Sequence, residues 1–220
     1  MGGKLTNPMS SLNAEKALIF RITHIRNIPW ILQNGVHCRN STVSDPNYVE
    51  IGNPELIRRR QERPVPVSPG GTLSDYVPFY FTPYSIMLYN IKTGYGEIRK
   101  IPNEEIVIIV SSLRRVADIG IRFVFTERHA YSLIANYFND LDSLDQVDWP
   151  LLQSRDFRHD PDDPGKKERY QAEALVYQAV PMSAILGIGC HSGSANEWLQ
   201  FHLAQAKLKI ETVIRPGWYF

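Results

Sequence analysis

The sequence predicts a single α+β domain, and three observations lead to this class. The chain has 220 residues, of which 43% are hydrophobic and 11% aromatic, so it can bury one sizeable core. Short apolar runs alternate with helix-like stretches, but the regular spacing of βαβ units is missing. No shift in composition marks a domain boundary. We therefore expect one domain over residues 1–220, with residues 1–15 forming a flexible N-terminal tail.

Composition also excludes several classes of protein. The net charge of +1 argues against a globally basic nucleic-acid binder, although charge can still be concentrated locally. Cys38 and Cys190 are the only cysteines, which is not the pattern of a disulfide scaffold. The N-terminus has no apolar signal core, and no run approaches the roughly 18 apolar residues of a membrane helix. These features predict a soluble, cytoplasmic protein.

Strands are predicted where short apolar runs are bounded by turn residues. In chain order they are expected at residues 17–23, 77–81, 104–112, 121–126 and 173–180. The run EEIVIIVSS at 104–112 is the strongest, because its continuous apolar residues indicate a strand that is buried on both faces. Shorter elements are expected at 185–191 and 209–214.

Helices are predicted where a capping residue precedes a longer stretch without turn residues. In chain order they are expected at residues 27–35, 53–63, 85–91, 128–138 and near 194–206. The first two begin with an asparagine cap, Asn27 or Asn53, followed by a proline in the first turn. Gly35 ends the first of them. Loops are expected at 36–52, 64–71 and 153–168, and the last is long enough to carry function.

The second predicted helix carries four arginines, Arg58, Arg59, Arg60 and Arg63. At ~100° per residue, Leu56 and Ile57 set its apolar face, and Arg60 points almost to the middle of that face. Arg58 points to the opposite, solvated side. An arginine on an apolar face needs an anion, which is either the partner in a structural salt bridge or a bound ligand. The helical pattern leaves both open.

Glu173 poses a similar question. It lies in ERYQAEALVY (168–177), within an apolar strand where it shares a face with Leu175 and Tyr177. Burying an ionised carboxylate is costly unless it is paired. One interpretation is a strand-end carboxylate held by Arg60 or by a backbone amide. The other is a carboxylate that faces a cleft, with a pKa raised by burial, which suits a proton acceptor.

Other familiar site signatures are missing. His24 and His129 each lie where a strand meets a predicted helix, and a lone histidine there is more often a structural hydrogen-bonding group. The two cysteines and six histidines show no metal-ligand spacing, so no metal site is expected. Neither a phosphate loop nor a GxGxxG fingerprint is present. Taken alone, these residues predict a polar cleft that suits an anion.

The order of several motifs carries more information than any one of them. They run from about residue 17 to the C-terminus: ITHIRNIPWILQNG, IGNPELIRRRQERPVP, PGGTLSDYVPFYFTPYSIMLY, FVFTERHAY, DFRHDPDDP, RYQAEALVY and the terminal GWYF. In this order they resemble the DarT family, bacterial toxins that ADP-ribosylate DNA using NAD. The resemblance implies an ADP-ribosyltransferase-like fold, in which central mixed β-sheets form an NAD cleft with flanking helices.

The resemblance also implies roles for individual residues. Glu173, in QAEALVY, matches the catalytic glutamate of the family, and Arg60, in RRRQER, matches its catalytic, NAD-orienting arginine. The residues implied to bind NAD are His24, Asn27, Gly52, Leu56, Arg60, Tyr80 and His129.

The segment at 153–171 matches the substrate-recognition loop of the family, and Phe157 and Tyr170 provide rings near its charges. The residues implied to contact DNA are Arg155, Arg158, Lys166, Lys167, Arg169, Tyr84 and Met87. One departure is PYSIM (83–87), which has Tyr84 and Ile86 where many relatives have a basic residue and a proline. This difference bears on base context.

A mechanism follows from the resemblance. The nicotinamide–ribose bond of NAD would break through an oxocarbenium-like state, which the Glu173 carboxylate would stabilise. The implied acceptor is thymine in single-stranded DNA, because a duplex hides the base. Glu173 or another group would remove its N3 proton, and Arg60 would bind the NAD phosphates or polarise the thymine carbonyls.

Alternatives remain for the acceptor. On the same fold, the acceptor could instead be guanine in DNA, an RNA, a protein, or water, in which case NAD is hydrolysed. A non-catalytic nucleic-acid-binding module is a further alternative. The resemblance also implies a partner, a DarG-type antitoxin whose macrodomain removes the ADP-ribose.

Overall fold

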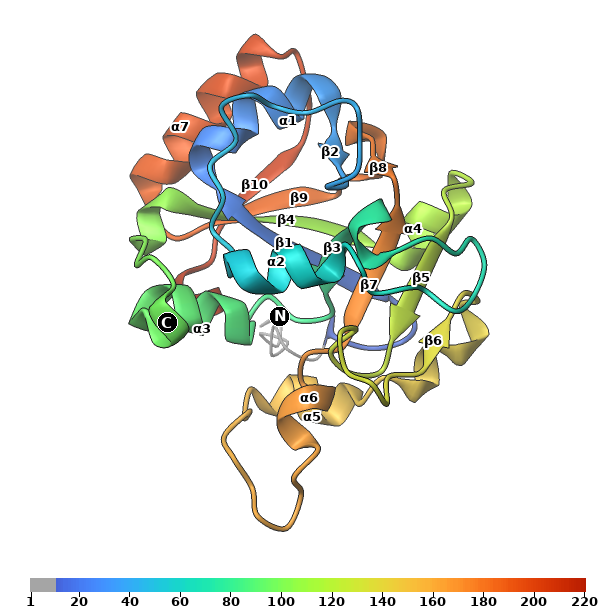
Figure 1. Ribbon diagram of the computed structural model, residues 1–220. Coiled ribbons are helices and arrows are strands. Elements are labelled where there is room, and N and C mark those ends of the chain that lie inside the picture. The colour runs from blue at the N-terminus through green and yellow to red at the C-terminus, as the bar shows by residue number, and fades with distance from the viewer. Residues whose placement is uncertain (1–10) are drawn as a thin grey trace, which may run out of the picture.

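Residues 11–220, which the computed structural model describes, fold around an eight-stranded β-sheet, beside a small two-stranded sheet (Figure 1). The strands are β1 (Leu18–His24), β2 (Val36–His37), β3 (Tyr76–Tyr80), β4 (Ile106–Ser112), β5 (Phe123–Thr126), β6 (Tyr137–Phe138), β7 (Glu173–Tyr177), β8 (Ala179–Val180), β9 (Gly187–Cys190) and β10 (Glu211–Ile214). The large sheet has the order β10-β9-β4-β1-β3-β7-β5-β6, and β2 pairs with β8. Only β9 and β10 pair in parallel among the described strands. The predicted α+β class with a mixed sheet is confirmed.

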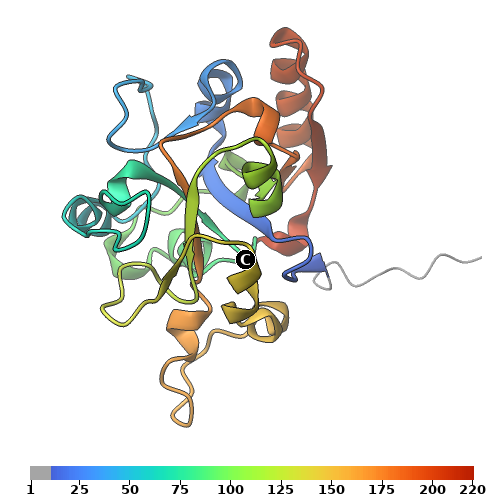
Figure 2. The same cartoon turned by 90° about the vertical axis from the view of Figure 1, so that its right-hand side faces the viewer.

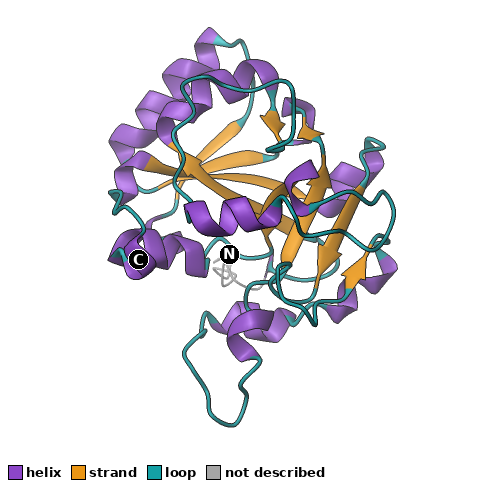
Figure 3. Cartoon of the chain, in the orientation of Figure 1, coloured by secondary structure: helices purple, strands orange, loops and turns teal. Residues whose placement is uncertain are grey.

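Helices surround this sheet (Figure 3). They are α1 (Ile28–Asn34), α2 (Pro54–Arg60), α3 (Ile86–Thr93), α4 (Leu113–Asp118), α5 (Trp149–Ser154), α6 (Lys166–Arg169) and α7 (Gly193–Gln205). The helix predicted at 53–63 begins as expected, because the Asn53 side chain accepts a hydrogen bond from the Leu56 amide, but it ends at Arg60. Among these helices, none combines the length and the apolar character needed to cross a bilayer.

The large sheet opens between β1 and β3, and this opening creates the site. These two strands share a single residue pair, Phe20 with Tyr80, whereas β1 pairs with β4 along its whole length. Pro78, in the middle of β3, has no N–H to donate. Its carbonyl accepts a hydrogen bond from Arg21 Nη1, at 2.9 Å, on the side of β1. Because the N–H and C=O of one strand residue point to the same side, Pro78 interrupts the ladder toward β1.

Strand β4 forms the centre of the core. Ile106, Val107, Ile108 and Ile109 are each at most 1% exposed, as the continuous apolar run predicted. Tyr219, near the C-terminus, is buried against this strand, and its hydroxyl donates to the Ile106 carbonyl at 3.0 Å.

Three of the predicted elements differ in the structure. The helix expected at 128–138 is a series of turns that ends in β6. The strand expected at 173–180 is divided into β7 and β8 by Gln178, which has a positive φ of 61°. The loop expected at 153–168 contains the last residues of α5 and most of α6. The connection between α5 and α6 projects away from the rest of the molecule in both Figure 1 and Figure 2.

The turns at 128–136 form because side chains from both near and distant positions accept hydrogen bonds from their backbone. Glu127 accepts hydrogen bonds from the backbone amide and the side-chain amide of Asn136, which closes the segment into a loop. The Ala130 amide donates to Glu173, and the Tyr131 amide donates to His129 Nδ1. Side chains that take up backbone donors in this way compete with helical hydrogen bonds.

The expected flexible tail at 1–15 lies partly outside the described residues, which start at residue 11. Within the described part, Leu12 is 1% exposed, and its carbonyl accepts a hydrogen bond from Gln153 Nε2. The Arg114 side chain donates to the carbonyls of Ala14 and Glu15. Residues 12–15 are therefore packed against the domain, in contrast to the expectation.

Candidate active site

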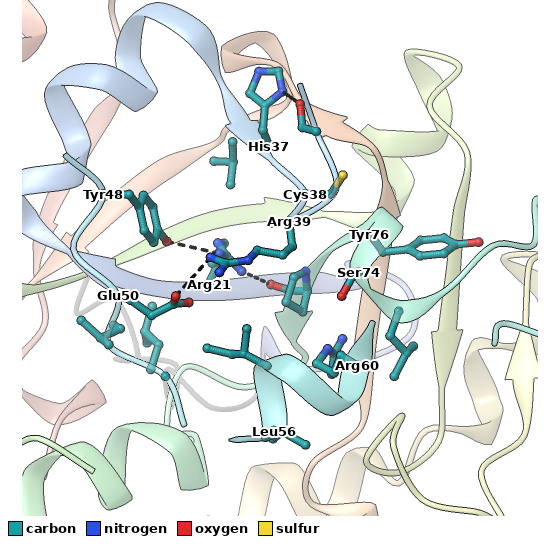
Figure 4. A pocket seen from close by; sticks show the side chains of 18 of the residues that line it. Arg21, His37, Cys38, Arg39, Tyr48, Glu50, Leu56, Arg60, Ser74 and Tyr76 are labelled. Atoms are coloured by element: carbon teal, nitrogen blue, oxygen red, sulfur yellow. Dashed lines mark hydrogen bonds and ion pairs between the residues drawn. The ribbon is translucent and has the colours of Figure 1, made fainter. Parts of the chain in front are cut away.

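A cavity of about 500 Å³ lies where the sheet opens, between β1, β3 and helices α1 and α2 (Figure 4). This volume falls in the range of small-molecule sites. Among the described residues, the arginines that line it are Arg21, Arg39 and Arg60. Carboxylates also reach it, from Asp45, Glu50 and Glu173.

Glu173 and Arg60 form an ion pair in this cavity. Arg60 Nη1 donates to Glu173 Oε2 at 2.9 Å, and their side chains are 11% and 3% exposed. The other carboxylate oxygen, Oε1, accepts from the Ala130 amide at 2.9 Å. Arg60 Nη2 is buried and has no hydrogen-bond partner among the described residues. The salt-bridge interpretation and the cleft interpretation of the two residues are thus both satisfied, since the pair lines a cavity and retains one unused donor.

The electrostatic environment keeps Glu173 ionised. Burial by itself would raise the pKa of Glu173, but the positive charge of Arg60, then His129 and the Ala130 amide, lower it below its ordinary value. The raised pKa expected from the apolar neighbours in the sequence is therefore wrong. Those neighbours indicate burial, but the cation that outweighs it comes from α2, far away in the chain.

Tyr80 and His129 complete the surroundings of the carboxylate. Tyr80 lies directly opposite Glu173 in the pairing of β3 with β7, and its hydroxyl lies 3.8 Å from Met87 Sδ. Burial, followed by the charge of Glu173, raises the pKa of Tyr80, so it stays a neutral hydroxyl. His129 Nε2 is 3.9 Å from Glu173 Oε1. Because His129 Nδ1 accepts from the Tyr131 amide, Nε2 is the ring nitrogen left to donate toward Glu173.

The structure brings most of the sequence-predicted NAD residues together. Those that line the cavity are Gly52, Leu56, Arg60, Tyr80 and His129. His24 and Asn27 are buried beside it and do not line it. His24 Nε2 contacts Glu105 Oε2 at 2.9 Å, on the side of β4.

Asn27 supports the cavity wall rather than capping its helix. Its side chain makes no cap hydrogen bond to α1, which differs from the prediction. Instead, Asn27 Nδ2 donates to Thr23 Oγ1 and to the Val49 carbonyl, and Oδ1 accepts from the Val49 amide at 2.8 Å. It thereby fixes the segment before Gly52 to the end of β1.

The residues predicted to contact DNA lie mostly outside the cavity. Met87 lines it, and Tyr84 packs between Arg155, whose guanidinium is 3.8 Å from the ring centroid, and Phe220. The segment 153–171 is not net basic. Its five basic residues (155, 158, 166, 167 and 169) are balanced by five acidic ones (156, 160, 162, 163 and 168).

Several of these charges pair with one another. Asp156 accepts from Arg158 and Lys166, and these contacts hold the pKa of Asp156 well below its usual range. Arg169 bonds Asp163 through two nitrogens and also contacts Asp148. Pairing of this kind shapes the segment, so fewer of its cations are free for phosphates than the sequence suggested.

Arg21 is a candidate that the sequence analysis missed. It projects from β1 into the cavity, and its guanidinium contacts the Pro78 carbonyl and, at 3.5 Å, the Tyr48 hydroxyl (Figure 4). Its Nε is buried with no hydrogen-bond partner among the described residues. The available signal was a charged residue within the apolar run ALIFRIT, the same signal that singled out Glu173.

No group of three histidine, cysteine, aspartate or glutamate side chains able to hold a metal ion occurs among residues 11–220. The cavity lining does contain a buried carboxylate, Glu173, together with arginine donors, the Tyr80 phenol and the His129 ring.

Comparison with known proteins identifies the family. The family model described as "ssDNA thymidine ADP-ribosyltransferase, DarT" matches residues 20–220. A DNA ADP-ribosyl transferase of Escherichia coli O127:H6 is 58% identical over 211 residues, which cover 96% of this chain and 97% of that protein.

Solved structures agree. Thermus sp. 2.9 DarT in complex with ADP-ribosylated ssDNA matches with a TM-score of 0.87 at 36% identity, over 94% of this chain and 97% of that one. The same protein in complex with NAD+ matches with a TM-score of 0.81. Thermosipho africanus DarTG in complex with ADP-ribose shares the fold, with a TM-score of 0.72 at 18% identity, over 92% of this chain and 51% of that one. The chain therefore belongs to the DarT family of single-stranded DNA thymidine ADP-ribosyltransferases.

Proposed function

We propose that this protein transfers ADP-ribose from NAD+ to thymidine in single-stranded DNA and releases nicotinamide, with Glu173 and Arg60 as its catalytic residues. The observation that carries the proposal is the buried Arg60–Glu173 pair, which lines a cavity of ligand size and keeps the carboxylate ionised. Membership of the DarT family, and the complexes of the Thermus protein with NAD+ and with ADP-ribosylated ssDNA, support it.

The cavity residues suit NAD+. The ligand carries a pyrophosphate, and the cavity offers two arginines with unused buried donors, Arg21 at Nε and Arg60 at Nη2. Donors without partners in a buried site are costly, and an anionic ligand would satisfy them. We assign Arg21 to the phosphates, with Gly52 and Leu56 as part of the wall against which NAD+ packs. His24 and Asn27 would not contact NAD+, but would hold the cavity wall in place through their buried hydrogen bonds.

NAD+ supplies the ADP-ribosyl group and, in nicotinamide, a leaving group. Glu173 has one oxygen on Arg60 and the other on the Ala130 amide, and an ionised carboxylate has about four acceptor sites, so it can accept further hydrogen bonds. A ribose hydroxyl bound there would feel a fixed negative charge as positive charge develops on the sugar. This interaction is stronger in the transition state than in the ground state, which accelerates the reaction.

Proton removal from the thymine also falls to Glu173. The most effective general base has a pKa near the working pH, and the lowered pKa of Glu173 makes it a weak base in the free protein. His129 presents Nε2 as a donor toward Glu173, so it serves the carboxylate and does not replace it as acceptor. We expect Arg60, through its free Nη2, to bind either an NAD+ phosphate or a thymine carbonyl.

The DNA would enter from the side of α3 and α6. Met87 reaches the cavity from α3, and Tyr84 joins Arg155 in a cation–π contact beside the segment 153–171. Lys167 is exposed on α6, and Arg158 is 86% exposed in its side chain, so both can meet phosphates. Lys166 and Arg169 would act mainly by holding the segment in shape, through Asp156 and Asp163.

Two wider assignments accompany this proposal. We assign the whole chain 1–220 to one ADP-ribosyltransferase domain that works in the bacterial cytoplasm, where its substrates occur. The DarTG name of the Thermosipho neighbour supports an antitoxin partner, and we propose a DarG-type macrodomain that removes the ADP-ribose.

The test uses purified protein, NAD+ and short single-stranded oligonucleotides that either contain one thymine or have guanine in its place. We expect an ADP-ribose adduct by mass spectrometry on the thymine strand only. Glu173→Gln should lower the rate at least about 10³-fold and keep a wild-type circular dichroism spectrum. Glu197→Gln, on α7, is the matched control and should retain full activity. Nicotinamide release without a DNA adduct, or transfer to RNA or protein alone, would contradict the acceptor.

A further inference from the structure

Two adjacent apolar side chains stand out on the surface. Leu133 is 86% exposed and Ile134 is 67% exposed, the highest values among the large hydrophobic residues that the structure describes. Single exposed apolar residues are ordinary, but two neighbours at the tip of one turn form a continuous apolar point. They belong to the connection between β5 and β6, which Figure 1 shows in yellow-green between α2 and α6.

The turn that carries them is held firmly in place. The Ser132 amide donates to the His129 carbonyl, and the Ala135 amide donates to the Ser132 carbonyl. Arg63 Nη2, in the segment that follows α2, donates to the Ser132 carbonyl at 2.8 Å. The Ser132 hydroxyl donates to Glu168 Oε2, on α6, at 2.7 Å. The exposure of the two side chains is thus set by a braced backbone on both sides of the turn.

This apolar point lies close to the catalytic carboxylate. The Ala130 amide bonds Glu173 Oε1 directly, and Leu133 follows three residues later. Three residues span at most about 11 Å, and the Ala130 hydrogen bond adds 2.9 Å, so the Leu133 backbone lies within roughly 14 Å of Glu173 Oε1. A nucleotide that neighbours an acceptor base at Glu173 can therefore reach the tip.

The surroundings supply charge of the sign that a nucleic acid needs. Arg63 donates to the Ser132 carbonyl, and Lys167 is exposed on α6 next to Glu168, the residue that the Ser132 hydroxyl contacts. Single-stranded DNA is bound by cations that follow the phosphates together with apolar or aromatic surfaces that cover the bases. Apolar side chains that insert beside bases are also the device by which proteins separate stacked bases.

We propose that Leu133 and Ile134 form a wedge that packs against the base adjacent to the target thymine, and so hold the acceptor unstacked at Glu173. This inference rests on the proposed function, because it assigns a specificity-determining contact for the same reaction. The occupant is a base of the single strand, since the tip belongs to the same turn as Ala130, whose amide bonds the Glu173 carboxylate at which the acceptor base must lie.

The first experiment compares the wild type with Leu133→Ser/Ile134→Ser in steady-state transfer to a thymine-containing oligonucleotide. We expect the KM for the oligonucleotide to rise about ten-fold, the scale of one lost base contact, while the KM for NAD+ stays within about two-fold. Because both side chains are exposed, the variant should fold normally. Phe201→Ser is the matched control, because Phe201 is 58% exposed on α7, and it should leave both constants unchanged.

The second experiment tests for a direct contact. Oligonucleotides with one abasic position on either side of the thymine are used with both proteins, as a double-mutant cycle. In the wild type, an abasic position in place of the base that the wedge contacts should raise the KM for the oligonucleotide about ten-fold. In the double variant, the same abasic position should raise that KM little further. Additive effects at every position would overturn the inference.

Two further outcomes are decisive. If the wild type modifies the oligonucleotide and the double variant has the same KM for it, the wedge is overturned and the proposed function stands. If the two KM values are equal and light scattering shows that the double variant has a different oligomeric state, Leu133 and Ile134 belong to a protein contact instead. Wild-type protein that modifies no oligonucleotide overturns the proposed function, and the wedge with it.

Discussion

Replacing Arg60 with methionine should destabilise the protein, because it leaves a buried carboxylate without its cation. Arg60 Nη1 lies 2.9 Å from Glu173 Oε2, and the two side chains are 11% and 3% exposed. Removing one partner of a buried pair costs about 3–5 kcal/mol. Because Arg60 is not completely buried, and the Ala130 amide and His129 remain near the carboxylate, we expect about 3 kcal/mol. Methionine keeps the apolar stem of the arginine, so little packing is lost.

This loss should depend on pH. In the wild type the pKa of Glu173 is lowered, so its contribution to stability is fully present above the ordinary glutamate value of about 4.5 and is lost as the pH falls through the folded-state pKa. In Arg60→Met, burial acts without the arginine and raises the pKa of Glu173, so the carboxylate can take up a proton at mildly acidic pH. The difference in unfolding free energy between the two proteins should therefore shrink from pH 7.5 to pH 5.

Urea denaturation followed by tryptophan fluorescence measures this difference at both pH values. Arg59→Met is the matched control, since Arg59 lies on the same helix with its side chain 54% exposed, and it should cost less than about 1 kcal/mol. A loss below about 1 kcal/mol for Arg60→Met at pH 7.5 would show that the pair is not effectively buried. A difference that stays constant with pH would refute the assignment of the cost to the Glu173 charge.

Three other predictions follow from the site. Because the pKa of Glu173 is lowered in the free protein, kcat/KM for transfer should show no acidic limb from Glu173 between pH 5 and 8, and such a limb would contradict an ionised free carboxylate. Arg21→Met should raise the KM for NAD+ about ten-fold with kcat within about three-fold, and an unchanged KM would remove Arg21 from the phosphate site. Asn27→Ala should cost about 2 kcal/mol, because the Val49 amide and carbonyl lose their partner, and should speed limited proteolysis near Val49; equal cleavage rates would argue against a supporting role.

The two members of the buried charged pair could be singled out from local sequence because each breaks a local rule. A charged residue in the middle of an apolar helix face or strand is expensive, so Arg60 and Glu173 had to be paired or used. The pairing itself agrees with that reasoning, and α2 with its Asn53 cap formed where the pattern predicted. Arg21 broke the same rule in β1 and could have been found in the same way.

The failures have a common cause. The segment 128–138 has the length and composition of a helix, but Glu127, Glu173 and Glu168 take up its backbone or side-chain donors from outside the local pattern. The expected direction of the Glu173 pKa shift was wrong for the same reason, because Arg60 is 113 residues away in the chain. Such competition depends on which side chains from elsewhere in the chain reach the segment in the folded protein. The hydrophobic periodicity of the segment does not encode this.

The sequence by itself determined the fold class, the family and the identity of the buried charged pair, because these depend on local pattern and on the order of motifs along the chain. Only the tertiary structure decided the shape of the site. The sheet opens at Pro78 because a strand without a donor cannot continue the ladder to β1, and Arg21 occupies the opening. The same packing leaves Leu133 and Ile134 exposed on the turn that follows Ala130, because Arg63 and Glu168 hold this turn through Ser132.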